Sequence, residues 1–279
     1  MRAIAQVGVV TVLAIAAVAT PRGQAGDPAK ILAAARQALG GEKRLSGVKT
    51  FVATGRTRQV RGDNLVPIEF EISVELPDKY IRKDEIPAQE NGPMIVGLSG
   101  DHLIQFPPQA TPPTRAGGPP APTAEQLERA RVARAAGVKQ DFARLALGMF
   151  AQAFIAYPLT FSYAGQAEAP QGTADVLDAK ATTDANVAMR FFVYRDTHVP
   201  IMVSWQGAPQ GSSPGIARGP APAPPVENRV YFADYRDVDG MRFPFRLRRA
   251  VGTDTVEEIV FDRFRINPKI DAKKFEVPK

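Results

Sequence analysis

The sequence of 279 residues contains no cysteine and only two histidines. The absence of cysteine excludes a disulfide scaffold, a thiolate zinc site, an iron–sulfur cluster, a thiol nucleophile and lipid attachment to an N-terminal cysteine. His102 and His198 are the only imidazoles, and neither a Gly-x-Ser-x-Gly motif nor a histidine pair at helical spacing accompanies them. We therefore predict no catalytic residue, no metal site and no cofactor, and expect each histidine to be an ordinary strand or turn residue.

No apolar run approaches the about 20 residues that a membrane-spanning helix needs. After the short positive start at Met1 and Arg2, residues 7–19 are almost wholly apolar and carry no charge, and they have the length of the apolar region of a secretory signal. Cleavage patterns of small residues end at Ala19 and at Ala25. We favour the second and predict a signal peptide over 1–25, because Asp27 then begins the first folded element; an uncleaved N-terminal anchor is the alternative.

The sequence also lacks a large excess of charge of either sign. Of 35 basic residues the predicted signal removes two, which leaves 33 against 29 acidic residues, a net charge of +4. This mild balance does not favour nucleic acid as a partner. Basic side chains gather on two predicted elements: Arg129, Arg131, Arg134 and Arg144, then Arg242, Arg246, Arg248 and Arg249. We interpret both groups as solvated faces, and the alternative is a docking surface for an acidic partner or anionic head groups.

Proline is abundant but uneven, since 13 of the 25 prolines fall in 107–122 and 207–225. We predict proline-rich loops there. After the first loop, Thr123 and Gln126 form a capping-box pattern that predicts a helix to about residue 136. Gly137 then separates it from a second predicted helix that ends at Tyr157-Pro158. Together these helices form a two-helix insert.

The rest of the mature chain alternates with a period of two. An N-terminal helix begins at Asp27 and stops at Gly40-Gly41, and the clearest strand follows at 68–76, with an apolar face opposite Glu69, Glu71 and Glu75. Some nine to eleven strands with hairpin-sized connections predict an antiparallel meander. We expect a mainly β (α+β) fold over 26–279: a single domain whose one curled antiparallel sheet forms an incomplete barrel.

Acidic residues on these strands invite a paired-carboxylate interpretation for glycoside hydrolysis. We instead expect Glu69, Glu71 and Glu75 to form a solvated strand face, and we interpret Glu257, Glu258 and Asp262 in the same way. The apolar strand faces are the stronger signal. We predict that a cavity for an apolar ligand is lined by Ile72, Val74, Met149, Phe150, Val203, Trp205, Phe243 and Phe245. An ordinary packed core is the alternative.

Three segments of this layout resemble the periplasmic outer-membrane lipoprotein carrier family, the LolA/LolB/RseB-like half-barrels. Residues 96–107 resemble the family's strand–turn–strand, 76–82 its preceding strand entry, and 270–278 its closing segment. Leu76 stands where the family carrier has an arginine before the proline, so the family's arginine latch is not carried over.

The resemblance implies a periplasmic carrier without catalytic activity. Its ligand would be a lipid or a lipoprotein acyl chain, and burial of apolar surface would drive the binding. An inner- or outer-membrane protein would be a further partner. The alternative function is a non-catalytic envelope interaction or stress-sensor protein with the same fold and no ligand.

Overall fold

The computed structural model describes residues 26–61, 64–87, 92–108, 121–154, 156–183, 187–207 and 224–277. The predicted signal peptide and most of both proline-rich loops lie outside these residues. The helical elements are α1 (Pro28–Ala38), α2 (Glu42–Leu45), α3 (Ala124–Phe150) and a final 3-10 turn, η1 (Ala272–Phe275).

The strands before α3 are β1 (Thr50–Arg61), β2 (Asn64–Glu75), β3 (Lys79–Glu85), β4 (Met94–Ser99) and β5 (His102–Phe106). Those after it are β6 (Leu159–Ala169), β7 (Gly172–Ala181), β8 (Ala188–Tyr194), β9 (Pro200–Gly207), β10 (Val226–Val238), β11 (Met241–Val251) and β12 (Asp254–Ile266).

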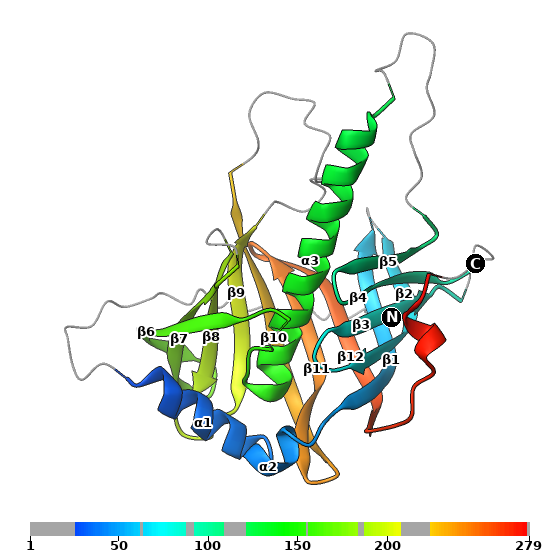
Figure 1. The fold of residues 1–279 in the computed structure, drawn as a ribbon. Coiled ribbons are helices and arrows are strands. Elements are labelled where there is room, and N and C mark those ends of the chain that lie inside the picture. The colour runs from blue at the N-terminus through cyan, green and yellow to red at the C-terminus, as the bar shows by residue number, and fades with distance from the viewer. Residues whose placement is uncertain are drawn as a thin grey trace, which may run out of the picture.

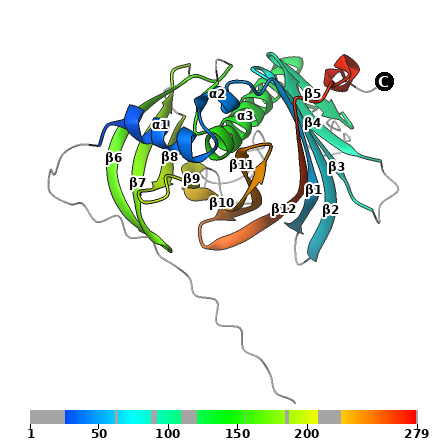
Figure 2. The ribbon, with the colours of Figure 1, turned by 90° about the horizontal axis from the view of Figure 1, so that it is seen from below.

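All twelve strands form one antiparallel sheet in the order β5-β4-β3-β2-β1-β12-β11-β10-β9-β8-β7-β6. The first and last strands therefore pair in the middle of the sheet, and β5 and β6 are its two edges. The sheet curls without closing, and α3, which connects the two edge strands, crosses its concave face (Figures 1 and 2). The predicted mainly β fold with a curled antiparallel sheet is confirmed, whereas the estimate of nine to eleven strands was too low.

The sequence alternation explains the curl, because each long strand has one apolar face. In β11, Phe243, Phe245 and Leu247 are buried, whereas Arg246 and Arg248 are exposed. The register between β1 and β12 shifts at Asp262, since Thr54 pairs with Arg263 but Gly55 pairs with Phe261. Such an irregularity bends a strand and increases its twist, which helps a sheet to curve.

The prediction of two helices in the insert is wrong, because α3 is one continuous helix of 27 residues. Its predicted capping box is present: Thr123 accepts from the backbone N–H of Gln126, whose side chain accepts in return. Gly137 costs an interior helix position only about 1 kcal/mol, too little to break a helix held by packing. The helix ends at Phe150, before Tyr157-Pro158, where Ala151 takes up the left-handed conformation.

Helices α1 and α2 cover one end of the curled sheet (Figure 1). The predicted cap of α1 is present, since the side chain of Asp27 accepts from the N–H of Ala29 and Pro28 occupies the first turn. Arg36 is buried and donates to the carbonyl of Phe150, the last residue of α3. The same face of α1 buries Leu39 completely. This end of the concavity is therefore closed.

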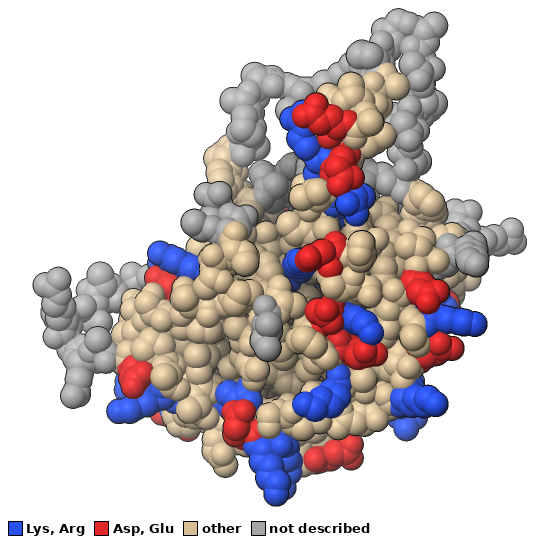
Figure 3. Space-filling view, viewed as in Figure 1, with Lys and Arg blue, Asp and Glu red and all other residues tan. Residues whose placement is uncertain are grey.

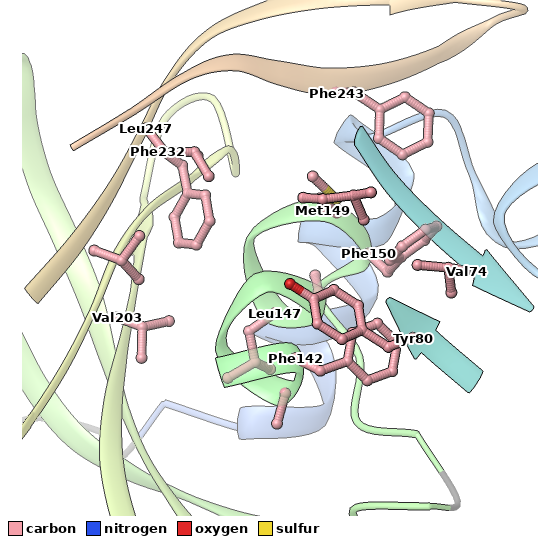
Figure 4. Close-up of a cluster of buried hydrophobic side chains, with 14 of the residues drawn as sticks. Val74, Tyr80, Phe142, Leu147, Met149, Phe150, Val203, Phe232, Phe243 and Leu247 are labelled. Carbon is pink, nitrogen blue, oxygen red and sulfur yellow. The ribbon is translucent and has the colours of Figure 1, made fainter. Parts of the chain in front are cut away.

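The main core lies between the concave face and the C-terminal half of α3. In Figure 4, Phe142, Leu147, Met149 and Phe150 project from the helix among side chains of the surrounding strands. Aromatic rings bind the layers together, as in the contact of Phe150 with Phe243 at 5.7 Å between centroids. On the opposite, convex face, Phe275 of η1 packs with Ile81 and Ile104 in a smaller cluster.

Candidate functional site: a cavity under α3

A cavity of about 380 Å³ lies between α3 and the concave face, where the helix leaves the main core. Its apolar wall comes from strands on both halves of the sheet and includes Phe70, Ile72, Val96, Val230, Ile259 and Phe261. Val138 and Leu145 contribute from α3. The volume falls within the about 300–1,000 Å³ of small-molecule pockets.

The cavity lies toward the end of the sheet that α1 and α2 leave open. The backbone N–H of Arg242 donates to the carbonyl of Leu39 at the end of α1, so the start of β11 marks the closed end. Leu247 and Arg249, which line the cavity, lie five and seven residues farther along the same strand. At about 3.4 Å per residue, this places them about 17–24 Å from the closed end.

The predicted lining residues divide into two groups. All eight belong to or pack against the main hydrophobic cluster, but Ile72 and Trp205 alone among them line the cavity. The other six are packed in the core: Val74, Met149, Phe150, Val203, Phe243 and Phe245. Their role in ligand binding stays a prediction.

A charged network crosses the cavity, and it overturns the interpretation of Glu257 as part of a solvated face. Glu257 is 5% exposed and points to the concave side. Its Oε1 accepts from Arg82 at 2.9 Å, from Thr57 at 2.9 Å and from Gln59 at 3.0 Å. Arg82 also donates to Asp84 at 2.7 Å. Four side chains of β1 and β3 thus converge with a carboxylate of β12.

The network continues from the sheet to α3 through Arg249. Its guanidinium lies 3.6 Å from Glu257 and 3.7 Å from Asp141 of the helix. Asp141 also pairs with Arg144 at 2.8 Å. Arg249 and Arg144 were both expected on solvated faces, and this expectation is wrong: Arg249 is half-buried in the cavity, and Arg144 is 6% exposed.

Arg144 is the most deeply buried of the arginines on α3. Its Nη2 donates to Gln140 at 3.0 Å, and its guanidinium carbon lies 3.8 Å from the ring centroid of Trp205, a cation–π contact. Its Nε is buried and has no hydrogen-bond partner within the described part of the chain. Burial lowers the pKa of Arg144, while Asp141 opposes this effect.

The two central charges stabilise each other against desolvation. Burial on its own would raise the pKa of Glu257, but Arg82 and Arg249 outweigh it and hold the pKa at about 2. Burial would likewise lower the pKa of Arg82, but Glu257 and Asp84 raise it above its ordinary value. Both groups are therefore charged at neutral pH.

Strand parity contains the signal that could have located these residues. Glu257 is in phase with Ile259 and Phe261, and Arg249 is in phase with Leu247, so alternation alone points both inward. A charge in an inward position was interpreted as solvated because buried charges are rare unless paired. Their partners lie far away in sequence, since 175 residues separate Arg82 from Glu257.

The other candidate residues lie outside the cavity. Glu69 is exposed, while Glu71 and Glu75 pair with lysines: Glu71 with Lys274 at 2.5 Å and Glu75 with Lys79 at 2.7 Å. Glu258 and Asp262 are exposed, as expected. His102 and His198 are exposed at the ends of hairpins.

Two kinds of feature are absent from the described residues, a metal-ligand cluster and a membrane-spanning helix. Among them, no three or more histidine, aspartate or glutamate side chains gather as a metal ion would require. None of the helices within the described ranges combines the length and apolar character needed to cross a bilayer, since α3 is long but rich in charge.

Comparisons with known proteins place the fold. No family model matches the sequence, and no curated protein matches it. Among solved structures, a LolA superfamily protein from Nitrosomonas europaea is similar over 89% of this chain and 97% of its own, with 12% identity and a TM-score of 0.54. An outer membrane lipoprotein-sorting protein domain from Vibrio parahaemolyticus is similar over the same shares of the two chains, with 9% identity and a TM-score of 0.50.

An open, curled antiparallel sheet with a helix across its concave face defines the structural class of this protein. It is the fold of the LolA-like half-barrels, and the resemblance seen in the sequence is confirmed at the level of the fold.

Proposed function

We propose that this protein is an exported, periplasmic carrier or binding protein for an apolar ligand, a lipid or a lipoprotein acyl chain, and that it performs no catalysis. The observation that carries the proposal is the cavity between α3 and the concave face. Apolar side chains from both halves of the sheet line it, and α1 and α2 leave its end of the sheet uncovered. Burial of an acyl chain there would supply about 0.8 kcal/mol per methylene.

Three further observations support the proposal. The sequence begins with a segment that has the features of a secretory signal, which favours export. The similar Vibrio structure is described as an outer membrane lipoprotein-sorting domain, which favours a role in envelope lipid or lipoprotein trafficking. The N-terminal half of α3 extends beyond the sheet (Figures 1 and 3). Charges there pair within the helix, as in Glu125–Arg129, so this half of the helix does not depend on the sheet to keep them paired.

The test uses the mature protein purified from an envelope fraction. Organic extraction followed by lipid mass spectrometry should recover an acyl-bearing species, and a fluorescent fatty acid should bind the delipidated protein. If no such species co-purifies and the fluorescent fatty acid does not bind, the carrier proposal is wrong.

A cavity-filling variant makes the test specific. Val138 is buried and lines the cavity, whereas Val132 of the same helix is 56% exposed. We expect Val138→Phe to reduce fatty-acid binding and Val132→Phe to leave it unchanged. Equal effects of the two substitutions would place the ligand elsewhere.

A second candidate is an envelope interaction or stress-sensor protein with the same fold and no ligand. The observation that favours it is the dense packing of the concave face, where Val74, Met149, Val203 and Phe243 are fully or almost fully buried. Absence of bound lipid, together with a stable and unaltered fold, would support this candidate over the carrier.

A further inference from the structure

We infer that the apolar ligand carries an anionic head group, which arginines at the cavity bind. This inference rests on the proposed function and specifies the ligand class. Four guanidinium groups line the cavity, from Arg82, Arg134, Arg144 and Arg249. Three carboxylates face them, from Asp84, Asp141 and Glu257, which leaves one positive charge in excess.

The excess lies on the helix side. Arg82 pairs closely with two carboxylates, Glu257 at 2.9 Å and Asp84 at 2.7 Å. Glu257 in turn receives three hydrogen bonds on its Oε1 from side chains of the sheet. In this half of the network the carboxylates outnumber the arginines, so it does not attract a further anion.

Three arginines remain with donors to spare. Arg249 meets both of its carboxylates at 3.6 and 3.7 Å, beyond the about 2.7–3.2 Å of a hydrogen bond. Arg144 has a buried Nε without a partner among the described residues. Arg134 lies exposed where α3 leaves the sheet, and no ion pair joins it to another described residue.

Buried N–H groups are normally satisfied, and an arginine donates most strongly to a carboxylate or a phosphate. An anionic oxygen beside Arg144 would accept from its Nε while Trp205 holds the guanidinium plane from one side. It would also provide the close partner that Arg249 lacks. Charge and unmade hydrogen bonds therefore point to the same occupant.

The apolar wall begins beside these arginines. Phe70, Ile72, Ile259 and Phe261 line the same cavity, so one molecule can place its head group against the arginines and its chain against the sheet. The volume of about 380 Å³ is at the lower end of the pocket range and favours a single chain. A fatty acid and a single-chain phospholipid share this chemistry and differ in the anion, carboxylate or phosphate.

The experiment compares three ligands of equal chain length by calorimetry at low ionic strength: dodecanoate, dodecyl phosphate and dodecanol. We expect the better anion to bind at least about tenfold more tightly than dodecanol, since its charge-assisted hydrogen bonds have no counterpart in the alcohol. The tighter of the two anions identifies the source of the head group.

The outcomes separate the two proposals. If dodecanol binds as tightly as both anions, the head-group inference is overturned and the carrier proposal stands. If none of the three ligands binds, the carrier proposal fails, and the inference fails with it.

Variants of α3 locate the anion. Arg134→Gln and Arg144→Met should each weaken binding of the preferred anion severalfold and leave dodecanol binding unchanged, and retained dodecanol binding also shows that the cavity is intact. Arg129→Gln is the matched control, because Arg129 is an exposed arginine of the same helix paired with Glu125. An equal loss in the control would mean that general electrostatic attraction, and no specific site, holds the anion.

Discussion

Glu257 is a buried carboxylate whose charged form is stabilised by partners from three other strands of the sheet, β1, β3 and β11. Its Oε1 accepts from Arg82, Thr57 and Gln59, and Arg249 lies on its other oxygen. A buried ion pair contributes little net stability over an apolar pair, but removal of one partner leaves a buried charge uncompensated. Substitution of Glu257 should therefore destabilise the fold strongly.

Glu257→Gln should lower the free energy of unfolding by about 3 kcal/mol, because Arg82 loses its main counter-charge in a buried site. The matched control is Glu258→Gln, since the neighbouring side chain is exposed on the other face of β12 and should cost less than about 0.5 kcal/mol. Urea denaturation of both variants measures the difference. Equal costs would mean that Glu257 does not face inward.

The pH dependence of stability should report the same carboxylate. The pKa of Glu257 is about 2 in the folded protein, against an ordinary value of 4.5. The unfolded chain therefore binds more protons between these values, and about 3 kcal/mol of stability present above pH 4.5 is lost as the pH falls toward 2.

This loss can be isolated by comparing the protein with Glu257→Gln across the same range. The difference in unfolding free energy between them should be full near pH 7 and should shrink toward zero near pH 2, where the wild-type carboxyl is protonated too. A difference that stays constant with pH would show that the carboxylate charge does not contribute.

At the scale of the element, α3 shows how packing overrides a local signal. A glycine between two apolar stretches favoured a break at Gly137, yet the helix continues because its C-terminal half is held by the sheet. Tyr235 of β10 donates to the carbonyl of Gly148 at 2.8 Å, and the ring of Phe232 occupies the space beside Gly148. These strand contacts hold the part of the helix that follows the weak position.

The two glycines of α3 make opposite predictions. A Cβ at Gly137 would meet no described atom within 4 Å, so Gly137→Ala should raise the free energy of unfolding by about 0.5–1 kcal/mol. A Cβ at Gly148 would overlap the ring of Phe232, so Gly148→Ala should lower the free energy of unfolding by about 1–3 kcal/mol. Thermal or urea unfolding measures both. Destabilisation by Gly137→Ala would argue against a continuous helix.

At the scale of the whole molecule, the connection between the two sheet edges determines whether the concave face could open. Helix α3 joins β5 to β6, and these edges do not pair with each other. Movement of the helix away from the concave face would therefore break no strand pairing, although it would separate α3 from the main core. Lys139 of α3 forms an ion pair with Asp101 in the β4–β5 turn, which marks one place where the helix meets the first half of the sheet.

A cross-link at that contact should slow ligand exchange. Because the chain has no cysteine, Asp101→Cys and Lys139→Cys introduce a unique pair that a short bismaleimide can join. If α3 must move for a ligand to enter, the cross-linked protein should exchange a fluorescent fatty acid at least about tenfold more slowly, since gating motions limit such steps. Stopped-flow displacement measures the rate.

The control cross-link lies within the sheet. Asp178 of β7 and Arg190 of β8 are paired neighbours, with an ion pair of 3.2 Å, and they lie on the solvent side of the sheet. The same bismaleimide between cysteines at 178 and 190 should leave the exchange rate unchanged. Equal rates in both cross-linked proteins would mean that the ligand enters without movement of α3.

The sequence by itself determined the strand faces, the antiparallel order of neighbours and the capped starts of α1 and α3. These features depend on local periodicity and on contacts within a few residues, so they can be predicted from the chain in order. It also indicated an apolar concave face, and Ile72 and Trp205 do line the cavity.

Only the tertiary structure decided where that face is filled and where it is open. Six of the eight predicted lining residues belong to the core that forms between α3 and the sheet. The cavity opens nearer the N-terminus of the helix, where Leu145 and Val138 line it. The tertiary structure likewise decided that Arg82, Glu257, Arg249 and Arg144 meet. Their meeting depends on strand register and helix position across sequence separations as long as 175 residues, which no local pattern of residues specifies.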